Sequence, residues 1–427
     1  MSEQPDSVST PPTAVPSGAG SGTATPDTVT VDDVRAAREL LRGIIRDTPI
    51  QGSRPLSERV GGPVWLKCEN LQRAGSFKIR GAYTRISRLS PEQAAKGVVA
   101  ASAGNHAQGV ALAASLLGIH STVFMPEGAP IPKVQATKAY GAEVRFHGHA
   151  VDEALVKAKE FADETGAVLV HPFDHVDIVA GQGTVGLEIL EQLPDVRTVV
   201  VCTGGGGLLA GIATAIKAER PEVRVVGVQA EDAAAYPASL DAGRPIALES
   251  MATMADGIAV GCPGQVPFAI IRDLVDEIVT VSEESLSKAL LLCLERNKLV
   301  VEAAGVAGVA ALLDAPEAFE PPVVVVLSGG NIDPLLLQRV LRHGLAVAGR
   351  FLSFRARIAD RPGALARLLA EVAAADASVL EVEHVRTDAR LRVDEVEVAL
   401  QLETRGAEHC DDVLNRLREA GYTLVFG

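Results

Sequence analysis

The chain has 427 residues, with 40 Lys and Arg against 54 Asp and Glu, so its formal net charge is −14. That length provides two or three domains with a substantial core. The acidic balance argues against binding to nucleic acid or to an anionic membrane, because both need a basic face, and no apolar run approaches the roughly 18 residues that cross a bilayer. Five widely spaced cysteines without a C-x-x-C pair indicate reduced thiols, so we expect a cytoplasmic protein with neither a disulfide framework nor a zinc site.

The first 30 residues are rich in Pro, Ser, Thr, Gly and Ala and contain almost no large apolar side chain. Such a segment cannot bury enough surface to offset the entropy of ordering it, so residues 1–30 are expected to be disordered. They have neither the basic start nor the apolar centre of a secretory signal.

Residues 31–349 alternate short β-branched runs with helical patterns. The predicted strands are 64–67, 98–102, 121–125, 143–146, 168–171, 198–202, 223–230 and 323–327. The predicted helices include 108–117, 151–165, 178–193 and 208–217. Apolar strands that alternate with helices favour an α/β fold with parallel sheets covered on both faces. The length favours two α/β lobes, with a ligand cleft at the carboxyl ends of the strands.

A different pattern begins near Phe351. Apolar and polar residues alternate from Leu352 to Ile358, which predicts a half-buried strand. A helix over 364–374, strands over 378–385 and 396–402, a helix over 408–420 and a strand over 422–426 follow. This β-α-β-β-α-β order is ferredoxin-like. We therefore predict a separate domain over residues 350–427, with its boundary near 343–350.

A run of glycines follows one predicted strand and opens a helix at Leu208. It consists of Gly204, Gly205, Gly206 and Gly207. Backbone N–H groups at such a helix start, free of side chains, form a cradle for an anion and suit a phosphate. A flexible turn is the alternative.

Lys78 lies in the first turn of a helix that we expect Ser76 to cap. A cation there is disfavoured by the helix dipole, but a lysine kept neutral as a nucleophile is tolerated. Taken alone, the segment is better explained as a surface helix with an exposed lysine.

Two further loops follow predicted strands. The first consists of Ser102, Ala103, Gly104, Asn105 and His106. Its small residues let a ligand approach the backbone, and its free N–H groups could hold a substrate carboxylate. The alternative is an ordinary turn with a structural histidine. In the second loop, the Ser328 hydroxyl could hydrogen-bond a ring nitrogen without charging it, or could simply belong to a Ser-Gly turn.

Together these segments resemble the threonine/serine dehydratase family, which are pyridoxal-phosphate enzymes of the tryptophan-synthase-β fold type. The matching segments are S-F-K-I-R-G-A at 76–82, S-A-G-N-H-A-Q at 102–108, the glycine run with Leu208, and S-G-G-N at 328–331. The resemblance covers about residues 31–349. It implies that Lys78 forms a Schiff base with pyridoxal 5′-phosphate, that Asn105 contacts the 3′-oxygen, and that Ser328 faces the pyridine nitrogen. The glycine run and Leu208 would hold the phosphate.

The resemblance implies deamination of L-threonine to 2-oxobutanoate and ammonia by β-elimination, with the Lys78 amine as general base. A neutral serine leaves the ring nitrogen largely unprotonated, which suits prompt departure of a β-hydroxyl. The alternatives are a catabolic or L-serine-preferring dehydratase, and a pyridoxal-phosphate-binding amino-acid sensor with little turnover. A β-replacement enzyme is disfavoured by the residues at 102–108.

Two positions separate this chain from similar families. Related serine racemases carry a second Ser where this chain has Ala103, so racemisation is not expected. Glu231 matches the acidic residue of a family cation site. Pro237 stands where a divalent site has an aspartate, so only a monovalent cation is expected at Glu231.

The C-terminal domain resembles an ACT domain through D-R-P-G-A-L at 360–365. ACT domains bind small ligands, often amino acids, near that glycine and at subunit interfaces. Asp360, Pro362 and Gly363 are thus the candidate regulatory residues. The resemblance implies the first step of isoleucine biosynthesis, inhibition by isoleucine, antagonism by valine, and a dimer or tetramer. A dimerisation module without a ligand is the alternative.

Overall fold

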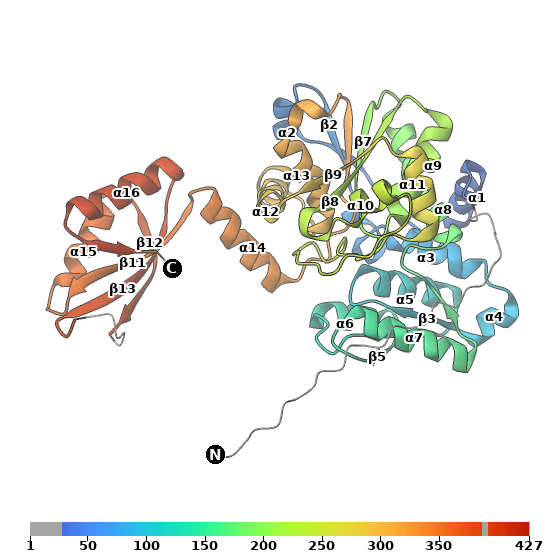
Figure 1. Cartoon of the computed structure of the whole chain (residues 1–427), viewed down its shortest axis with the longest axis horizontal. Helices are drawn as coiled ribbons and strands as arrows, with labels where there is room; N and C mark the ends of the chain where they lie inside the picture. The colour runs from blue at the N-terminus through green and yellow to red at the C-terminus, as the bar shows by residue number, and fades with distance from the viewer. Residues whose placement is uncertain (1–27, 387–391, 427) are drawn as a thin grey trace, which may run out of the picture.

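The computed structural model describes residues 28–386 and 392–426. It contains two α/β lobes and a C-terminal module that one helix joins to them (Figure 1). The segment predicted to be disordered, residues 1–30, lies outside the described residues except for its last three. The Thr30 side chain accepts a hydrogen bond from the N–H of Asp33 and caps the first helix.

The large lobe is built on a six-stranded sheet with the order β1-β2-β10-β7-β8-β9. Its strands are β1 (Ile50–Gly52), β2 (Val64–Lys67), β7 (Thr198–Cys202), β8 (Arg224–Ala230), β9 (Glu277–Val281) and β10 (Val323–Val326). All pairs are parallel except β1 with β2. The central strand β10 consists of four fully buried valines that face two cores in alternation, which explains its unbroken apolar run.

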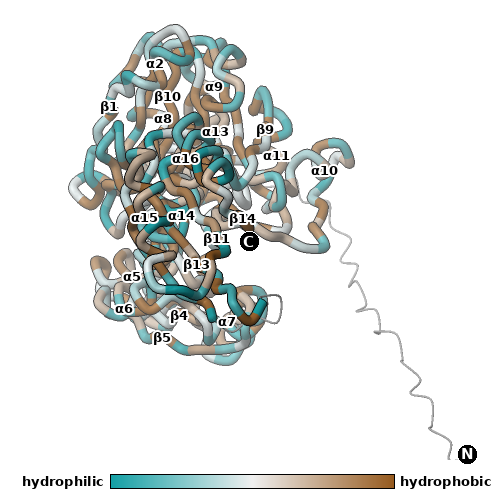
Figure 2. The backbone as a smooth tube through the Cα atoms, turned by 90° about the vertical axis from the view of Figure 1, so that its left-hand side faces the viewer, coloured by the Kyte–Doolittle hydropathy of each residue, from teal (hydrophilic) through white to brown (hydrophobic). Residues whose placement is uncertain are grey.

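The small lobe has a four-stranded parallel sheet with the order β5-β4-β3-β6. Its strands are β3 (Val98–Ala101), β4 (Ser121–Met125), β5 (Glu143–Phe146) and β6 (Val168–Leu169). Separate apolar clusters, one with helix α5 (Asn105–Leu117) and one with helix α7 (Val151–Thr165), pack on the sheet. In Figure 2 the outer turns of the molecule are largely hydrophilic, and hydrophobic stretches run through the centre of the large lobe.

Helices cover both sheets. Those of the two lobes are α1 (Val31–Leu41), α2 (Arg54–Val60), α3 (Lys78–Ser87), α4 (Pro91–Lys96), α5 (Asn105–Leu117), α6 (Ile131–Ala139), α7 (Val151–Thr165), α8 (Val176–Gln192), α9 (Gly207–Glu219), α10 (Ala235–Ala242), α11 (Gln265–Leu274), α12 (Glu283–Leu292) and α13 (Ala307–Asp314). Helix α8 packs on both α3 and α9, and so connects the lobes. Gly81 and Gly181 permit the close approach of α3 and α8, because a Cβ on Gly181 would lie 2.6 Å from the Arg80 carbonyl oxygen.

Helix α14 (Pro334–Val347) leads from the large lobe to the C-terminal module. The module comprises β11 (Phe351–Ala359), α15 (Ala364–Ala374), β12 (Ser378–Val385), β13 (Glu395–Glu403), α16 (Ala407–Glu419) and β14 (Thr423–Val425). Its antiparallel sheet has the order β12-β13-β11-β14 and a core of its own. That order is the ferredoxin-like arrangement predicted from the sequence.

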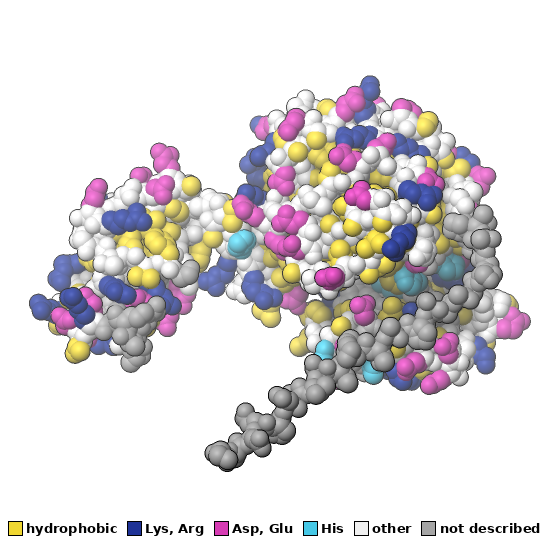
Figure 3. Space-filling model, in the orientation of Figure 1, with side chains coloured by type: hydrophobic (Ala, Val, Ile, Leu, Met, Phe, Trp, Pro, Cys, Tyr) yellow, Lys and Arg dark blue, Asp and Glu magenta, His cyan; other side chains and the backbone are white. Residues whose placement is uncertain are grey.

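The predicted α/β architecture is confirmed, and the predicted strands differ from the observed ones mainly at their ends. The segment 168–171 pairs over only two residues. Strands β1 and β9 were not predicted; β1 has three residues, and β9 is a partly exposed edge strand of five residues. No helix in residues 28–386 or 392–426 is long and apolar enough to cross a membrane. Acidic and basic side chains are interspersed over the face shown in Figure 3.

Candidate active site

A cavity of about 830 Å³ lies between the two lobes. It brings together all four segments that the sequence singled out: Lys78, the loop 102–106, the glycine run with Leu208, and Ser328. The segments come from the carboxyl ends of β3, β7 and β10 and from the start of α3. Parallel α/β sheets place their ligands at these strand ends. Glu231 is exposed in the turn Glu231–Ala233 and does not line the cavity, so its cation site stays a prediction.

Lys78 is the first residue of α3, and its Nζ donates to the Pro172 carbonyl oxygen at 3.0 Å. Burial lowers the pKa of Lys78 to about 8, so a fraction of this amine on the order of a tenth is neutral near pH 7. The interpretation of Lys78 as an exposed surface lysine is therefore wrong. A neutral amine in a cavity is the form that attacks a carbonyl group.

The expected cap of this helix is wrong. Phe77, not Ser76, occupies the N-cap position, and no side chain caps the helix. Ser76 is extended and forms a bridge with Gly329, while the Phe77 N–H donates to the Ser328 carbonyl oxygen. This pairing holds the lysine segment against the 328–331 loop. The buried Ser76 Oγ has no hydrogen-bond partner among the described residues.

Asn105 is held by two side chains of the large lobe. Its Oδ1 accepts from Asn331 Nδ2 at 2.8 Å, and its Nδ2 donates to Glu302 Oε1 at 2.6 Å. Among the described residues the second N–H of that Nδ2 has no acceptor, so it can donate to a ligand oxygen. Burial raises the pKa of Glu302 to about 7, so this acid is poised between its neutral and charged forms.

The start of α5 is open to an anion. Its N-cap is Gly104, which offers no side chain to the first N–H groups of the helix. Ser102 Oγ accepts from the Gly104 N–H at 3.1 Å and orders the turn. His106 contacts the Val170 carbonyl oxygen through Nε2, and burial lowers the pKa of His106 to about 3. This neutral, bonded ring is structural, although it also lines the cavity.

The glycine run leaves no room for side chains. Gly206 is the N-cap of α9 with φ +96°, and a Cβ there would lie 1.9 Å from the Tyr236 hydroxyl. A Cβ on Gly205 would lie 2.4 Å from the Phe173 ring. The result is a helix N-terminus with bare backbone donors against an aromatic wall. This cradle fits a phosphate group.

Ser328 is 2 % exposed and follows β10 into the cavity beside Cys202. Burial raises the pKa of Cys202 to about 11, so the thiol stays protonated and neutral. Ser328 therefore offers a neutral hydroxyl to the cavity. The cavity accommodates each part of pyridoxal phosphate in chemical terms: an amine for its aldehyde, a cradle for its phosphate, and a hydroxyl for its nitrogen.

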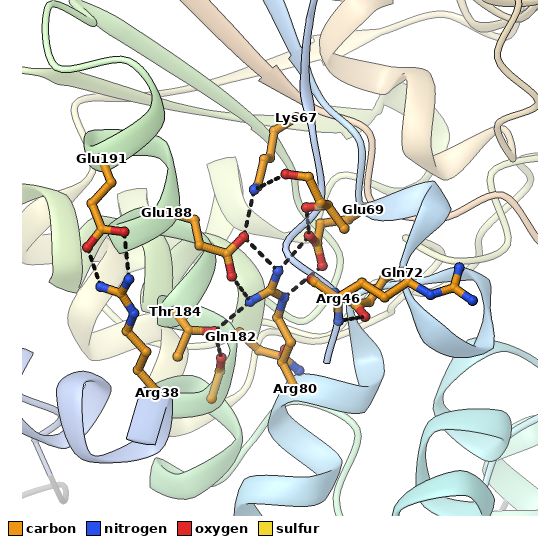
Figure 4. A network of polar contacts seen from close by, with 12 residues as sticks. Arg38, Arg46, Lys67, Glu69, Gln72, Arg80, Gln182, Thr184, Glu188 and Glu191 are labelled. Atoms are coloured by element: carbon orange, nitrogen blue, oxygen red, sulfur yellow. Dashed lines mark hydrogen bonds and ion pairs between the residues drawn. The ribbon is translucent and has the colours of Figure 1, made fainter. Parts of the chain in front are cut away.

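A buried ionic network surrounds Arg80 (Figure 4). Arg80 is fully buried and binds Glu69 through two hydrogen bonds of 2.8 Å. It also donates to Glu188 of α8 at 2.5 Å, and Lys67 binds the same carboxylate at 2.6 Å. Two cations and two anions therefore connect β2, α3 and α8, and Arg80 lies two residues after Lys78.

The sequence analysis did not predict several residues of the cavity. These are Lys133, Phe173, Asp256 and Glu302. Glu302 opens the segment E-A-A-G, in which nothing beyond the acid itself marks a site. The others lie in segments with no distinctive spacing, and only the fold brings them to the cavity.

The chain belongs to the family of pyridoxal-phosphate-dependent enzymes, whose model matches residues 41–329. The predicted cofactor and fold type are thereby confirmed. Within that family the chain is similar to the threonine ammonia-lyases. It is 48% identical over 392 residues to the L-threonine ammonia-lyase of Geobacter sulfurreducens. The aligned region covers 92% of this chain and 98% of that protein.

Solved structures agree with this placement. The threonine deaminase from T.th. shares 42% identity, has a TM-score of 0.68, and covers 71% of this chain and 99% of its own. The maize serine racemase shares 36% identity, has a TM-score of 0.70, and covers 75% of this chain and 99% of its own. The fold therefore does not separate a dehydratase from a racemase, and the site residues must do so.

Proposed function

We propose that this chain deaminates L-threonine to 2-oxobutanoate and ammonia, using pyridoxal phosphate bound at Lys78. The observation that carries the proposal is the position of the Lys78 amine, with its lowered pKa, in a cavity lined by the other three matching segments. The relative of similar length named L-threonine ammonia-lyase supports the choice of substrate.

Each site residue has a role in this reaction. The glycine run with Leu208 would hold the cofactor phosphate, Asn105 its 3′-oxygen and Ser328 its ring nitrogen. When bound, the cofactor supplies an electron-withdrawing system that acidifies the Cα proton of an amino acid. Lys78 accepts that proton, since its amine is partly neutral and lies inside the cavity. The N–H groups at the start of α5 bind the substrate carboxylate.

Ala103 favours elimination over racemisation. Racemisation needs a second proton donor on the opposite face of the substrate, and Ala103 has no side-chain proton to give. Its position in the cavity lining supports this distinction from the serine racemases. An L-serine-preferring or catabolic dehydratase remains the alternative within the class.

We further propose that the C-terminal module regulates the enzyme as an ACT domain. Gly363 adopts φ +84° and is the N-cap of α15, so the turn with Asp360 and Pro362 leaves backbone donors for a small ligand. Isoleucine is the proposed inhibitor and valine its antagonist, in a dimer or tetramer. This regulation would suit the first step of isoleucine biosynthesis.

Release of 2-oxobutanoate from L-threonine by the purified holoenzyme tests the proposal. We expect turnover that Lys78→Ala abolishes by at least about a thousandfold, because both the cofactor anchor and the base are lost. Inhibition by isoleucine would support the biosynthetic role. A higher kcat/KM for L-serine would favour the alternative dehydratase, and cofactor absorbance without product would favour the sensor.

A further inference from the structure

Lys133 is a buried lysine in the cavity to which neither the sequence analysis nor the proposed reaction assigns a role. It belongs to α6 of the small lobe and is 8 % exposed. Its Nζ lies 2.5 Å from Oδ2 of Asp256, which belongs to the large-lobe loop between α10 and α11. The pair therefore crosses from one lobe to the other at the cavity, and the Asp256 side chain is 54% exposed.

The Lys133 ammonium lies beside the start of α5. A Cβ placed on Gly104 would be 3.8 Å from Lys133 Nζ. Gly104 is the N-cap whose neighbouring N–H groups receive no side-chain partner. The charge of the ammonium and the positive end of the α5 dipole thus meet at one point in the cavity.

The placement of Lys133 is costly without a ligand. Lys133 is the third residue of α6, where the dipole of its own helix disfavours a cation. A buried ammonium also loses hydration. Among the described residues its ion-pair partner is Asp256 alone, and that carboxylate is half in solvent. An anion bound at the start of α5 would give the ammonium a second partner inside the cavity.

We propose that Lys133 is a substrate-binding residue, which binds the α-carboxylate of the amino acid together with the N–H groups of α5. Asp256 is a positioning residue that holds the ammonium at the cavity while the carboxylate enters. The inference rests on the proposed function for the class of ligand, a 2-amino acid, but not on the fate of its β-hydroxyl.

The kinetic test compares two lysines of the same helix in the holoenzyme. Lys133→Met keeps the length and removes the charge. Lys138→Met does the same at an exposed position of α6. Loss of one charge-assisted contact to a carboxylate should raise the KM for L-threonine about tenfold in Lys133→Met. We expect the Lys138→Met value to stay within about twofold of the wild type, and Lys133→Arg to recover part of the loss.

A binding test separates a charge contact from a structural role. L-Alanine has no β-hydroxyl to eliminate, and L-alaninamide is the same molecule without the carboxylate charge. Calorimetry on the holoenzyme should show that Lys133→Met weakens L-alanine about tenfold and leaves L-alaninamide within about twofold. Asp256→Asn should weaken L-alanine in the same direction by a smaller factor.

The outcomes are distinct. Equal weakening of L-alanine and L-alaninamide would overturn the proposal in favour of a purely structural pair between the lobes. Unchanged L-alanine binding in Lys133→Met would overturn it as well. If the wild type binds L-alanine in a Lys133-dependent way yet releases no 2-oxobutanoate from L-threonine, the proposed function fails while the carboxylate contact stands.

Discussion

At the scale of single residues, burial brings the pKa values of two cavity groups close to neutral pH. Desolvation lowers the pKa of Lys78 to about 8 and raises that of Glu302 to about 7. Both groups are therefore able to change charge near physiological pH. Because Glu302 bonds Asn105, its charge is coupled to a predicted cofactor contact.

Glu302→Gln should change how the stability of the folded state depends on pH, because ionising a buried acid is costly. The pKa of Glu302 is raised in the folded state, so its contribution to stability is present below the ordinary value of 4.5 and is lost as the pH rises to about 7. Glutamine does not titrate and keeps the oxygen that Asn105 contacts. The cofactor-free variant should therefore gain stability over the wild type between pH 4.5 and 7, by about 3 kcal/mol as an order of magnitude. Urea unfolding across that range measures the difference, and a constant difference would contradict the prediction.

Gly206→Ala should damage the phosphate cradle. The substitution strains a backbone with φ +96° and drives a Cβ into the Tyr236 hydroxyl. Gly243→Ala is the matched control, since Gly243 has φ +67° and nothing within 4 Å of its Cβ. We expect the control to lose about 1 kcal/mol of stability from backbone strain alone. Gly206→Ala should lose more and also retain less pyridoxal phosphate after gel filtration. Equal behaviour of the two variants would show that the close contact is unimportant.

Residues within short motifs could be predicted from the sequence, and residues outside them could not. Lys78, Asn105 and Ser328 each stand in a short contiguous motif that can be recognised in a single sequence. Lys133 and Asp256 gain their significance only from a contact between segments 123 positions apart. No local pattern carries that information, because it arises from the packing of one lobe against the other.

At the scale of elements, the position of α3 depends on its anchorage to α8. Arg80→Met would leave the buried Glu69 and Glu188 without their main cation. Breaking a buried pair in this way costs about 3–5 kcal/mol. Arg38→Met is the control, because Arg38 of α1 also binds a glutamate of α8, Glu191, in a pair that is about half exposed. Loss of such an exposed pair costs less than about 1 kcal/mol. Denaturant unfolding measures both, and losses of similar size would contradict the prediction.

The elements themselves were predictable where burial left a strong pattern. The valine run of β10 is buried at every position, whereas β11 alternates buried with more exposed positions, and both strands were located from the sequence. The edge strand β9 was missed although Ile278, Val279 and Val281 favour a strand, because it has only five residues and its glutamate and threonine positions are exposed. The start of α3 was misjudged because Ser76 pairs with Gly329 instead of capping the helix, and that partner lies far along the chain.

At the scale of the whole molecule, the C-terminal module stands apart from both lobes (Figure 1). Its core is formed by its own residues. Helix α14 packs on α12 of the large lobe, where Gly344 lies close to Ser287. Arg350 forms an ion pair with Glu295, just after α12. The next segment along the chain leads to Glu302 in the cavity, so the module is linked to the site through one continuous stretch.

A chain shortened to residues 1–349 should keep its catalytic activity and lose its regulation. The cavity residues all precede residue 350, and the module contributes none of its lining. We therefore expect kcat and KM for L-threonine to stay within about threefold of the values for the full chain. A change of that size is well below the 1.4 kcal/mol that corresponds to about tenfold. The response to isoleucine should disappear.

In calorimetry the full chain should show an unfolding transition that the shortened chain lacks, because a module with its own core melts as its own unit. Retained inhibition by isoleucine would place the effector site in the catalytic lobes, and loss of all turnover would show that α12 needs the module to hold Glu302 in place.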